Sequence, residues 1–152
     1  MSINGYLDVN LETSIGFIEA FPTPGRIIFS AYKAECCSFS GDVTYTTLVE
    51  NVGSGLDIRS GVFSCPQSGL YMLSFSGLVH NRQTATYIQI NTNGVQDFVI
   101  GSQSKAIEIA DHLSHTWLAH LNVNDKVTLK ITHGLMWSNT NERITFNGMK
   151  IK

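Results

Sequence analysis

The chain has 152 residues, a length that suits a single domain with a core of its own. Its 10 basic and 12 acidic residues leave a net charge of −2, which argues against nucleic acid as a partner and against a strongly acidic substrate. No apolar run reaches the roughly 18 residues of a membrane span, and the first basic residue is Arg26, so we expect no membrane insertion and find no signal-peptide start. Either the chain is intracellular or a leader is missing from it.

The first 25 residues carry large apolar side chains and end in a Pro/Gly cluster at residues 22–25. Such side chains do not stay in water, and the cluster marks a boundary. The sequence therefore predicts an extended N-terminal arm over residues 1–25, lying on the domain or on a neighbouring subunit, and a globular domain over residues 26–152. The apolar side chains of the arm are Leu7, Val9, Leu11, Ile15, Phe17, Ile18 and Phe21.

From Arg26 onward, short β-rich segments alternate with turn residues. Asn93-Gly94 lies between two of these segments and is a strong hairpin signal. Residues 106–113 fit both a helical spacing and a short strand, and we predict strand and loop because the rest of the domain is β-rich. Many short strands with turns between them indicate a sandwich or barrel. The other predicted strands cover residues 27–34, 43–49, 87–91, 95–100, 116–121, 126–132 and 144–151.

The segment from Gly61 to Ser76 forms the centre of the predicted core. Val62 and Phe63 begin a strand, residues 65–69 form a sharp corner, and Tyr71, Leu73 and Phe75 alternate with smaller side chains. Period-2 alternation places these large side chains on one face of a sheet. We interpret the segment as a core hairpin.

These residues also carry a family resemblance. The pattern G-x-F-x-C-P-x-x-G-x-Y-x-x-x-F from Gly61 to Phe75 resembles the signature of the complement C1q globular head. Further similarities are F-S-A at residues 29–31, Asn-x-Gly at residues 51–53 and F-x-G at residues 146–148. The resemblance spans residues 26–152 and implies an all-β jelly-roll sandwich of two antiparallel sheets, as in the tumour-necrosis-factor-like domains.

The same resemblance implies a secreted homotrimer that binds ligands and is not an enzyme. The chain lacks the Gly-X-Y stalk of many relatives, so it resembles the stalk-less or cerebellin-like members. It also has Asn124-Asp125 where the family usually has Gly-Asp, and both residues tolerate the turn.

No arrangement of side chains typical of catalysis or of zinc binding is evident. Asp111, His112 and His115 form a D-H-x-x-H cluster that could bind a divalent metal through two imidazoles and a carboxylate. The two histidines would share a face on a helix and point to opposite faces on a strand, and we expect them at a surface or subunit contact. We expect no cofactor. Calcium binding is an open alternative, because some C1q heads bind calcium, although the acidic residues of this chain are scattered along the sequence. Asp111 is the expected ligand if calcium binds.

The three cysteines, Cys36, Cys37 and Cys65, are expected to be reduced or only incidentally oxidised. A bridge from Cys36 or Cys37 to Cys65 or to another subunit stays open. Cys65 lies beside core aromatic residues, where a buried thiol is inert.

Three polar segments are candidate ligand-binding loops, since rigid scaffolds carry recognition on loops. The third contains a tryptophan beside amides and an arginine, which suits stacking on a sugar, although the same tryptophan could cap the end of the sandwich. The candidate residues are Asn81, Arg82 and Gln83; His112 and His115; and Trp137, Asn139, Asn141 and Arg143.

The favoured hypothesis is therefore a secreted, lectin-like trimer that recognises carbohydrate or other patterns on microbial or host surfaces in innate immunity. One alternative is a cytokine-like or synaptic-organiser-like trimer that binds a protein receptor, which the resemblance of residues 81–84 to the cerebellin branch supports. Another is a structural trimerisation module.

Overall fold

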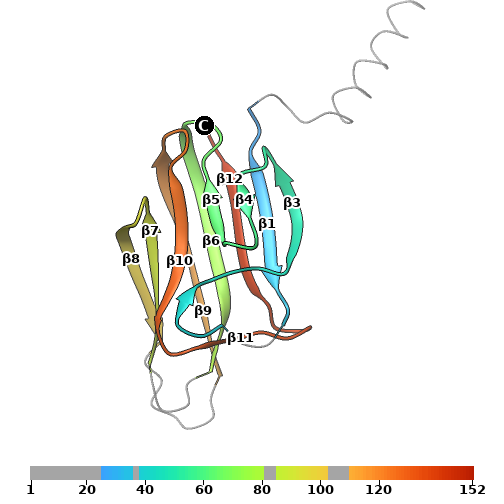
Figure 1. Ribbon diagram of the computed structural model, residues 1–152, viewed down its shortest axis with the longest axis vertical. Helices are drawn as coiled ribbons and strands as arrows, with labels where there is room; N and C mark the ends of the chain where they lie inside the picture. Colours follow the sequence, from blue (N-terminus) through green and yellow to red (C-terminus); the bar gives the residue numbers. More distant parts are fainter. Residues whose placement is uncertain (1–24, 36–37, 81–84, 103–109) are drawn as a thin grey trace, which may run out of the picture.

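The computed structural model describes residues 25–35, 38–80, 85–102 and 110–152. These residues contain no helix and form two six-stranded antiparallel sheets packed face to face (Figure 1). Sheet A contains β1 (Ile28–Lys33), β3 (Thr47–Val52), β6 (Gly69–His80), β9 (Ala110–Leu121), β11 (Met136–Trp137) and β12 (Ile144–Lys150). Sheet B contains β2 (Gly41–Asp42), β4 (Leu56–Asp57), β5 (Val62–Ser64), β7 (Thr86–Thr92), β8 (Val95–Ser102) and β10 (Lys126–His133).

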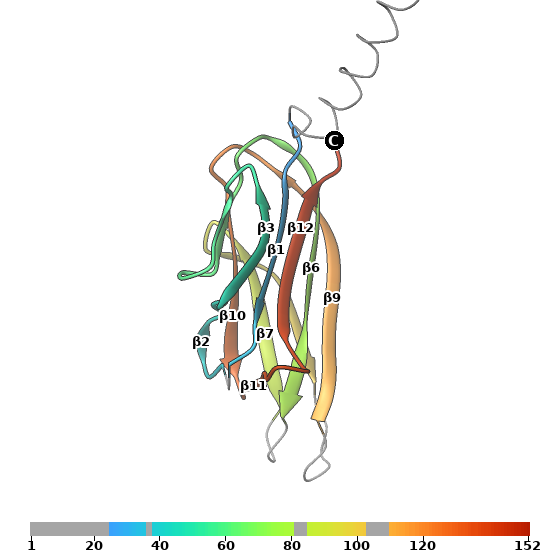
Figure 2. The ribbon, with the colours of Figure 1, turned by 90° about the vertical axis from the view of Figure 1, so that its right-hand side faces the viewer.

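The strands of each sheet are not in sequence order. Sheet A runs β9-β6-β12-β1-β3, with β11 beside β6 beyond the end of β12 (Figure 2). Sheet B runs β4-β5-β10-β7-β8, with β2 also paired to β10. Neighbouring strands therefore come from distant parts of the chain, as in a jelly roll. The predicted all-β sandwich of two antiparallel sheets is confirmed.

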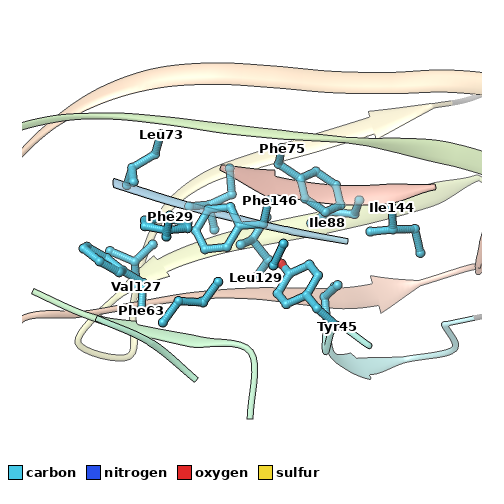
Figure 3. Close-up of a cluster of buried hydrophobic side chains, with 14 of the residues drawn as sticks. Phe29, Tyr45, Phe63, Leu73, Phe75, Ile88, Val127, Leu129, Ile144 and Phe146 are labelled. Carbon is cyan, nitrogen blue, oxygen red and sulfur yellow. The ribbon is translucent and has the colours of Figure 1, made fainter. Parts of the chain in front are cut away.

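Aromatic side chains from both sheets fill the core between them (Figure 3). Phe29 of β1 and Phe146 of β12 belong to sheet A, whereas Phe63 of β5 belongs to sheet B. The ring centroid of Phe29 is 4.6 Å from that of Phe63 and 4.9 Å from that of Phe146. All three side chains are at most 1% exposed. Their contacts hold the sheets together and exclude water from the space between them.

Gly148 lets the Phe29 ring approach the backbone of β12. A Cβ atom at this position would overlap the Phe29 ring, so a larger residue would force the ring out of its place. The F-x-G pattern at residues 146–148 thus has a packing reason, because Phe146 and Gly148 both contact the same ring from neighbouring positions on β12.

The prediction of a hairpin between β5 and β6 is wrong. β5 pairs with β4 and β10 in sheet B, while β6 pairs with β12 and β9 in sheet A, so the corner at residues 65–69 carries the chain between sheets. The Cys65 N–H donates to the Asp125 carbonyl, which fixes the corner against the β9–β10 turn. Phe63 and Tyr71 consequently meet across the core, with ring centroids 5.6 Å apart.

The predicted hairpin at Asn93-Gly94 is confirmed. Asn93 and Gly94, both with positive φ, connect the paired strands β7 and β8. The predicted turn at residues 122–125 connects β9 in sheet A to β10 in sheet B, so it carries the chain between sheets. The two turns are joined, because the Asn93 side chain donates to Asp125 and accepts from the Lys126 N–H, each at 2.8 Å. The hydrogen bond from Asn93 and that from the Asn122 N–H hold the pKa of Asp125 below its usual range.

Several predicted boundaries change. β6 continues to His80, and β9 begins at Ala110, so the ambiguous segment is strand from residue 110 while residues 103–109 lie outside the described residues. Residues 43–46 precede β3 and are not strand. The predicted arm at residues 1–24 also lies outside the described part.

The described cysteine, Cys65, is free and buried, and its thiol donates to the Gln67 carbonyl at 3.0 Å. Cys36 and Cys37 lie outside the described residues.

Tyr71 offers a test of the core. Its ring is fully buried and its hydroxyl donates to the Gln67 carbonyl at 2.6 Å, and burial raises the pKa of that hydroxyl. We expect Tyr71→Ala to lower the free energy of unfolding by about 3–5 kcal/mol through loss of the ring. Tyr71→Phe removes only the hydrogen bond and should cost about 0.5–1.5 kcal/mol. Urea denaturation measures both, and equal losses would show that the hydroxyl, not the ring, carries the effect.

Candidate functional site

The outward face of sheet A consists of the side chains that point away from the core. On β6 the core side chains are Tyr71, Leu73 and Phe75, so the residues between them point outward. The strand register aligns these outward positions in four rows across the sheet. Row 1 is His112, Leu78 and Trp137; row 2 is Ser114, Ser76, Thr145, Tyr32 and Thr47; row 3 is Thr116, Ser74, Asn147, Ser30 and Glu50; row 4 is Leu118, Met72, Met149, Ile28 and Val52.

Row 4 is apolar across its whole width. Leu118 is 60% exposed, Met149 39% and Met72 38%. A depression of about 230 Å³ lies among rows 3 and 4, with Ile28, Met72 and Met149 in its lining. Large apolar side chains gathered on one exposed surface indicate an interaction site.

Rows 2 and 3 are polar but already hydrogen-bonded among themselves. Thr116 donates to Ser74 at 3.2 Å, and the hydroxyls of Ser76 and Thr145 are 2.7 Å apart. Ser30 donates to Asn147 at 2.6 Å. These bonds cross between β9, β6, β12 and β1, so the six side chains that form them have partners without water. A face of this kind loses little when another surface covers it.

Trp137 lies on this face, in strand β11. The sequence pattern had predicted a loop at this position, and that prediction is wrong. Met136 and Ser38 exchange main-chain hydrogen bonds of 2.9 and 2.8 Å on one side, and Met136 and Trp137 pair with Val79 and Leu78 of β6 on the other. Met136 is fully buried, so its neighbour Trp137 faces outward. Leu78, at the centre of row 1, is only 8% exposed.

Arg143 is held on a neighbouring aromatic ring. Its guanidinium carbon is 4.1 Å from the ring centroid of Tyr32, in row 2. Within the described residues no carboxylate pairs with this guanidinium, so its N–H groups remain available to an anionic group of a ligand. Arg143, Tyr32 and Trp137 therefore lie at the same end of the outward face.

His112 and His115 point to opposite faces of β9, as expected for a strand. His112 is exposed in row 1. His115 faces inward, with its ring 5.5 Å from that of Phe98 and 5.8 Å from that of Trp117, and its buried Nε2 has no hydrogen-bond partner. The two imidazoles do not converge on one site.

Asp111 accepts a hydrogen bond from Ser102 at 2.7 Å, which connects β9 to β8. No three His, Cys, Asp or Glu side chains among the described residues lie close enough together to hold a metal. A single carboxylate supplies at most two of the six to eight oxygens that calcium takes.

Asn139 and Asn141 belong to a turn that is closed on itself. The Asn139 side-chain oxygen accepts from the N–H groups of Asn141 and Glu142, each at 2.8 Å, and its amide donates to Glu142 at 3.2 Å. Ser138 before the turn is 1% exposed and donates to the Glu35 carbonyl. Asn139 therefore shapes the loop, while the side chain of Asn141 is exposed.

Asn81, Arg82 and Gln83 lie outside the described residues, so their place relative to this face stays a prediction. The structure brings Trp137, His112 and Arg143 to the same face, and it adds Tyr32, which the sequence had not suggested. The alternation of Ser and Thr opposite the core aromatics was the available signal for the polar rows.

Comparison with known families finds that residues 28–151 match the model of the C1q domain. The human and mouse proteins named complement C1q tumor necrosis factor-related protein 3 are each 26% identical to this chain over 106 residues. The alignment covers 70% of this chain but 43% of each relative, so the chain matches less than half the length of these proteins.

Solved structures with the same fold include the globular domain of zebrafish complement 1qA, with a TM-score of 0.68 and 18% identity over 84% of this chain and 98% of that one. Eiger TNF from S. frugiperda has a TM-score of 0.66 and 11% identity over 84% and 93% of the two chains. Murine APRIL at pH 5.0 has a TM-score of 0.67 and 16% identity over 83% and 99%. At these identities the likeness shows the fold alone. In the part of the chain that the structure describes, no helix is long and apolar enough to cross a membrane.

The turn at residues 139–142 depends on the side-chain oxygen of Asn139, and substitution of this residue tests that dependence. We expect Asn139→Ala to lower the free energy of unfolding by about 0.5–1.5 kcal/mol, because two main-chain N–H groups lose their partner. Asn139→Ser, whose hydroxyl can still accept from the turn, should lose less. Thermal and urea denaturation measure the difference. If Asn139→Ala is as stable as the parent, the turn does not depend on this amide, and Asn139 returns to the ligand-binding candidates.

Proposed function

Because the chain belongs to the C1q domain family, we propose that it is a secreted, non-enzymatic recognition module that forms a homotrimer and binds its ligand at one end of the outward face of sheet A. The observation that carries the proposal is the outward face itself, whose row 4 is apolar and exposed and whose rows 2 and 3 form their own hydrogen bonds.

The composition of this face favours contact with a second copy of the chain. Across rows 2 to 4 the aligned positions carry one charged residue, Glu50, at the edge strand β3. Covering the aligned positions would thus remove apolar side chains from water, with the charges of Glu50 at the β3 edge and of Arg143 at the β11 end left at the margins of the contact. A face with exposed methionine and leucine and an internally bonded polar centre is suited to a stable subunit contact. The threefold arrangement comes from the family.

The proposed ligand is carbohydrate, or another repeated pattern, on microbial or host surfaces, recognised in innate immunity. Trp137 offers an aromatic side chain, and the Arg143 guanidinium is held above the Tyr32 ring. Aromatic rings stack on the apolar face of a sugar, and guanidinium groups bind hydroxyls or carboxylates. Three weak sites on one trimer would bind a repetitive surface much more tightly than one.

A protein receptor is the second candidate. The curated relatives carry the name tumor necrosis factor-related, and one of the similar structures is named Eiger TNF. Under this alternative the same trimer would cluster a receptor, and residues 81–84 would form part of the contact.

Assembly is tested by a charge placed in row 2. Ser76→Asp should prevent trimer formation, because an unpaired carboxylate would be buried at the contact, whereas Ser76→Ala removes the hydroxyl without adding charge and should leave the trimer intact. Light scattering should give the parent and Ser76→Ala a molar mass three times the 16.7 kDa of one chain. Ser76→Asp should have the molar mass of a single chain. Both variants forming trimers would show that this face is not the contact, and a monomeric parent would contradict the homotrimer.

Ligand class is tested with a glycan array. We expect the trimeric protein to bind selected glycans in a manner that free sugar competes away, and Trp137→Ala to lower the signal at least severalfold while remaining a trimer. Thr140→Ala, at an exposed position in the turn that follows β11, is the matched control for a side chain without a ring. A repeat in chelator tests calcium, for which Asp111 is the candidate ligand. If an intact trimer binds no glycan on the array, the carbohydrate proposal is wrong and a protein receptor becomes the favoured ligand. If Trp137→Ala binds glycans as well as the parent, Trp137 is not part of the site.

A further inference from the structure

The depression on the outward face lies at the end of the molecule where the polypeptide enters the sandwich. Its lining includes Ile28, Met72, Met149, Ser30, Ser74 and Asn147. Ile28 is the first residue of β1, and Met149 lies three residues before the C-terminus. Figures 1 and 2 show the start of β1 and the C-terminus at the same end. At about 230 Å³ the depression is larger than the roughly 150 Å³ that suffice to hold a benzene ring in an apolar cavity.

The chain makes a turn immediately before it reaches this depression. Gly25 has φ +83°, a conformation that favours glycine, and it is the first described residue. Two residues later the Ile27 carbonyl accepts from the Lys150 N–H at 3.0 Å, which fixes the chain beside β12. Gly25 also lies near the Gln67 side chain, next to the start of β6. The preceding segment is therefore attached at the edge of the depression.

The preceding segment has the composition to fill it. Residues 15–21 contain Ile15, Phe17, Ile18 and Phe21, and their only charged residue is Glu19. Phe21 is four residues before Gly25, a span of up to about 14 Å in extended chain, so it can reach Ile28, which lies three residues, or at most about 10 Å, after Gly25. Tethering at Gly25 also keeps its local concentration high compared with that of any free partner.

We propose that the N-terminal segment of the same chain docks on the outward face of sheet A, with the aromatic side chain of Phe21 in the depression between Met72 and Met149 and that of Phe17 beside it on row 4. Docked there, the segment takes the place of row 4 in the proposed subunit contact, and rows 1 to 3 stay open to other surfaces, including a second copy. This docking does not depend on the proposed homotrimer, because it needs only one copy of the chain.

Methionine oxidation in the full-length protein provides the test. Hydrogen peroxide oxidises exposed methionines, and mass spectrometry gives a rate for each one. Met72 and Met149 report on the depression, and Met136, which is fully buried in the core, reports on folding. The test variant carries Phe17→Asp, Ile18→Asp and Phe21→Asp. The matched control carries three aspartates at polar positions of the same segment, as Asn10→Asp, Thr13→Asp and Thr23→Asp.

We expect Met72 and Met149 to be oxidised severalfold faster in the test variant than in the parent or the control, with Met136 slow in all three. Equal rates at Met72 and Met149 in the parent and the test variant would overturn the proposal. If Met136 is also oxidised faster, the triple variant is unfolded. The single variant Phe21→Ser then replaces it, and equal oxidation rates at Met72 and Met149 in that variant and the parent would overturn the proposal.

Light scattering on each sample separates this inference from the proposed trimer. One result is that parent and test variant are both trimers and that Met72 and Met149 are protected from oxidation equally in both. A second copy then covers the depression, so the docking would be wrong and the trimer right. Another result is that the samples are monomers and that Met72 and Met149 lose their protection from oxidation in the test variant. The docking would then be right and the trimer wrong. Trimers of parent and test variant that differ in protection support both.

Discussion

The contact between Phe29, Phe63 and Phe146 is the constraint on which the rest of the structure depends. These rings come from β1, β5 and β12, three strands far apart in the sequence, and they are the point at which sheet A meets sheet B. Phe146 also stacks with Tyr45 and Trp117, at centroid distances of 5.8 and 6.4 Å, so one side chain connects the centre of the core to its edge at β9. Because strand side chains alternate, fixing these rings inward fixes their neighbours outward. The surface of sheet A is thus a consequence of its core.

That coupling explains why the outward face is ordered in rows. A shift of one residue in any strand of sheet A would turn its core residues to solvent, so burial of the aromatics specifies the register strongly. The same register brings Thr116 beside Ser74, Ser76 beside Thr145, and Asn147 beside Ser30. Each pair is hydrogen-bonded across a strand boundary. A polar surface that satisfies itself in this way can lie next to an apolar row and still be covered at low cost.

The sequence was sufficient for the fold class and for features that depend on local chemistry. The Asn93-Gly94 turn and the inward alternation of Tyr71, Leu73 and Phe75 were predictable because each depends on neighbours in the chain. The β5–β6 corner was not, since alternation is identical whether two strands pair within a sheet or face one another across a core. The contact of Arg143 with Tyr32 was hidden for a similar reason, because it requires the order β12-β1, which joins residues more than a hundred positions apart. Trp137 was assigned to a loop because a two-residue strand paired through Ser38 and β6 has no periodic pattern.

The placement of Trp137 and Arg143 also bears on how assembly and recognition would be related. Both lie at the β11 end of the outward face, while the apolar row lies toward the chain termini. A subunit contact over rows 2 and 3, and over row 4 or the segment docked on it, would leave row 1 at the margin of the interface. Side chains there are partly desolvated and held by packing but still reach solvent. Rings and guanidinium groups bind most strongly in such surroundings, because the lower effective dielectric strengthens their polar contacts and less side-chain freedom is lost. Under that geometry the intrinsic affinity of each site would depend on the assembled state, in addition to the gain from three sites on one particle.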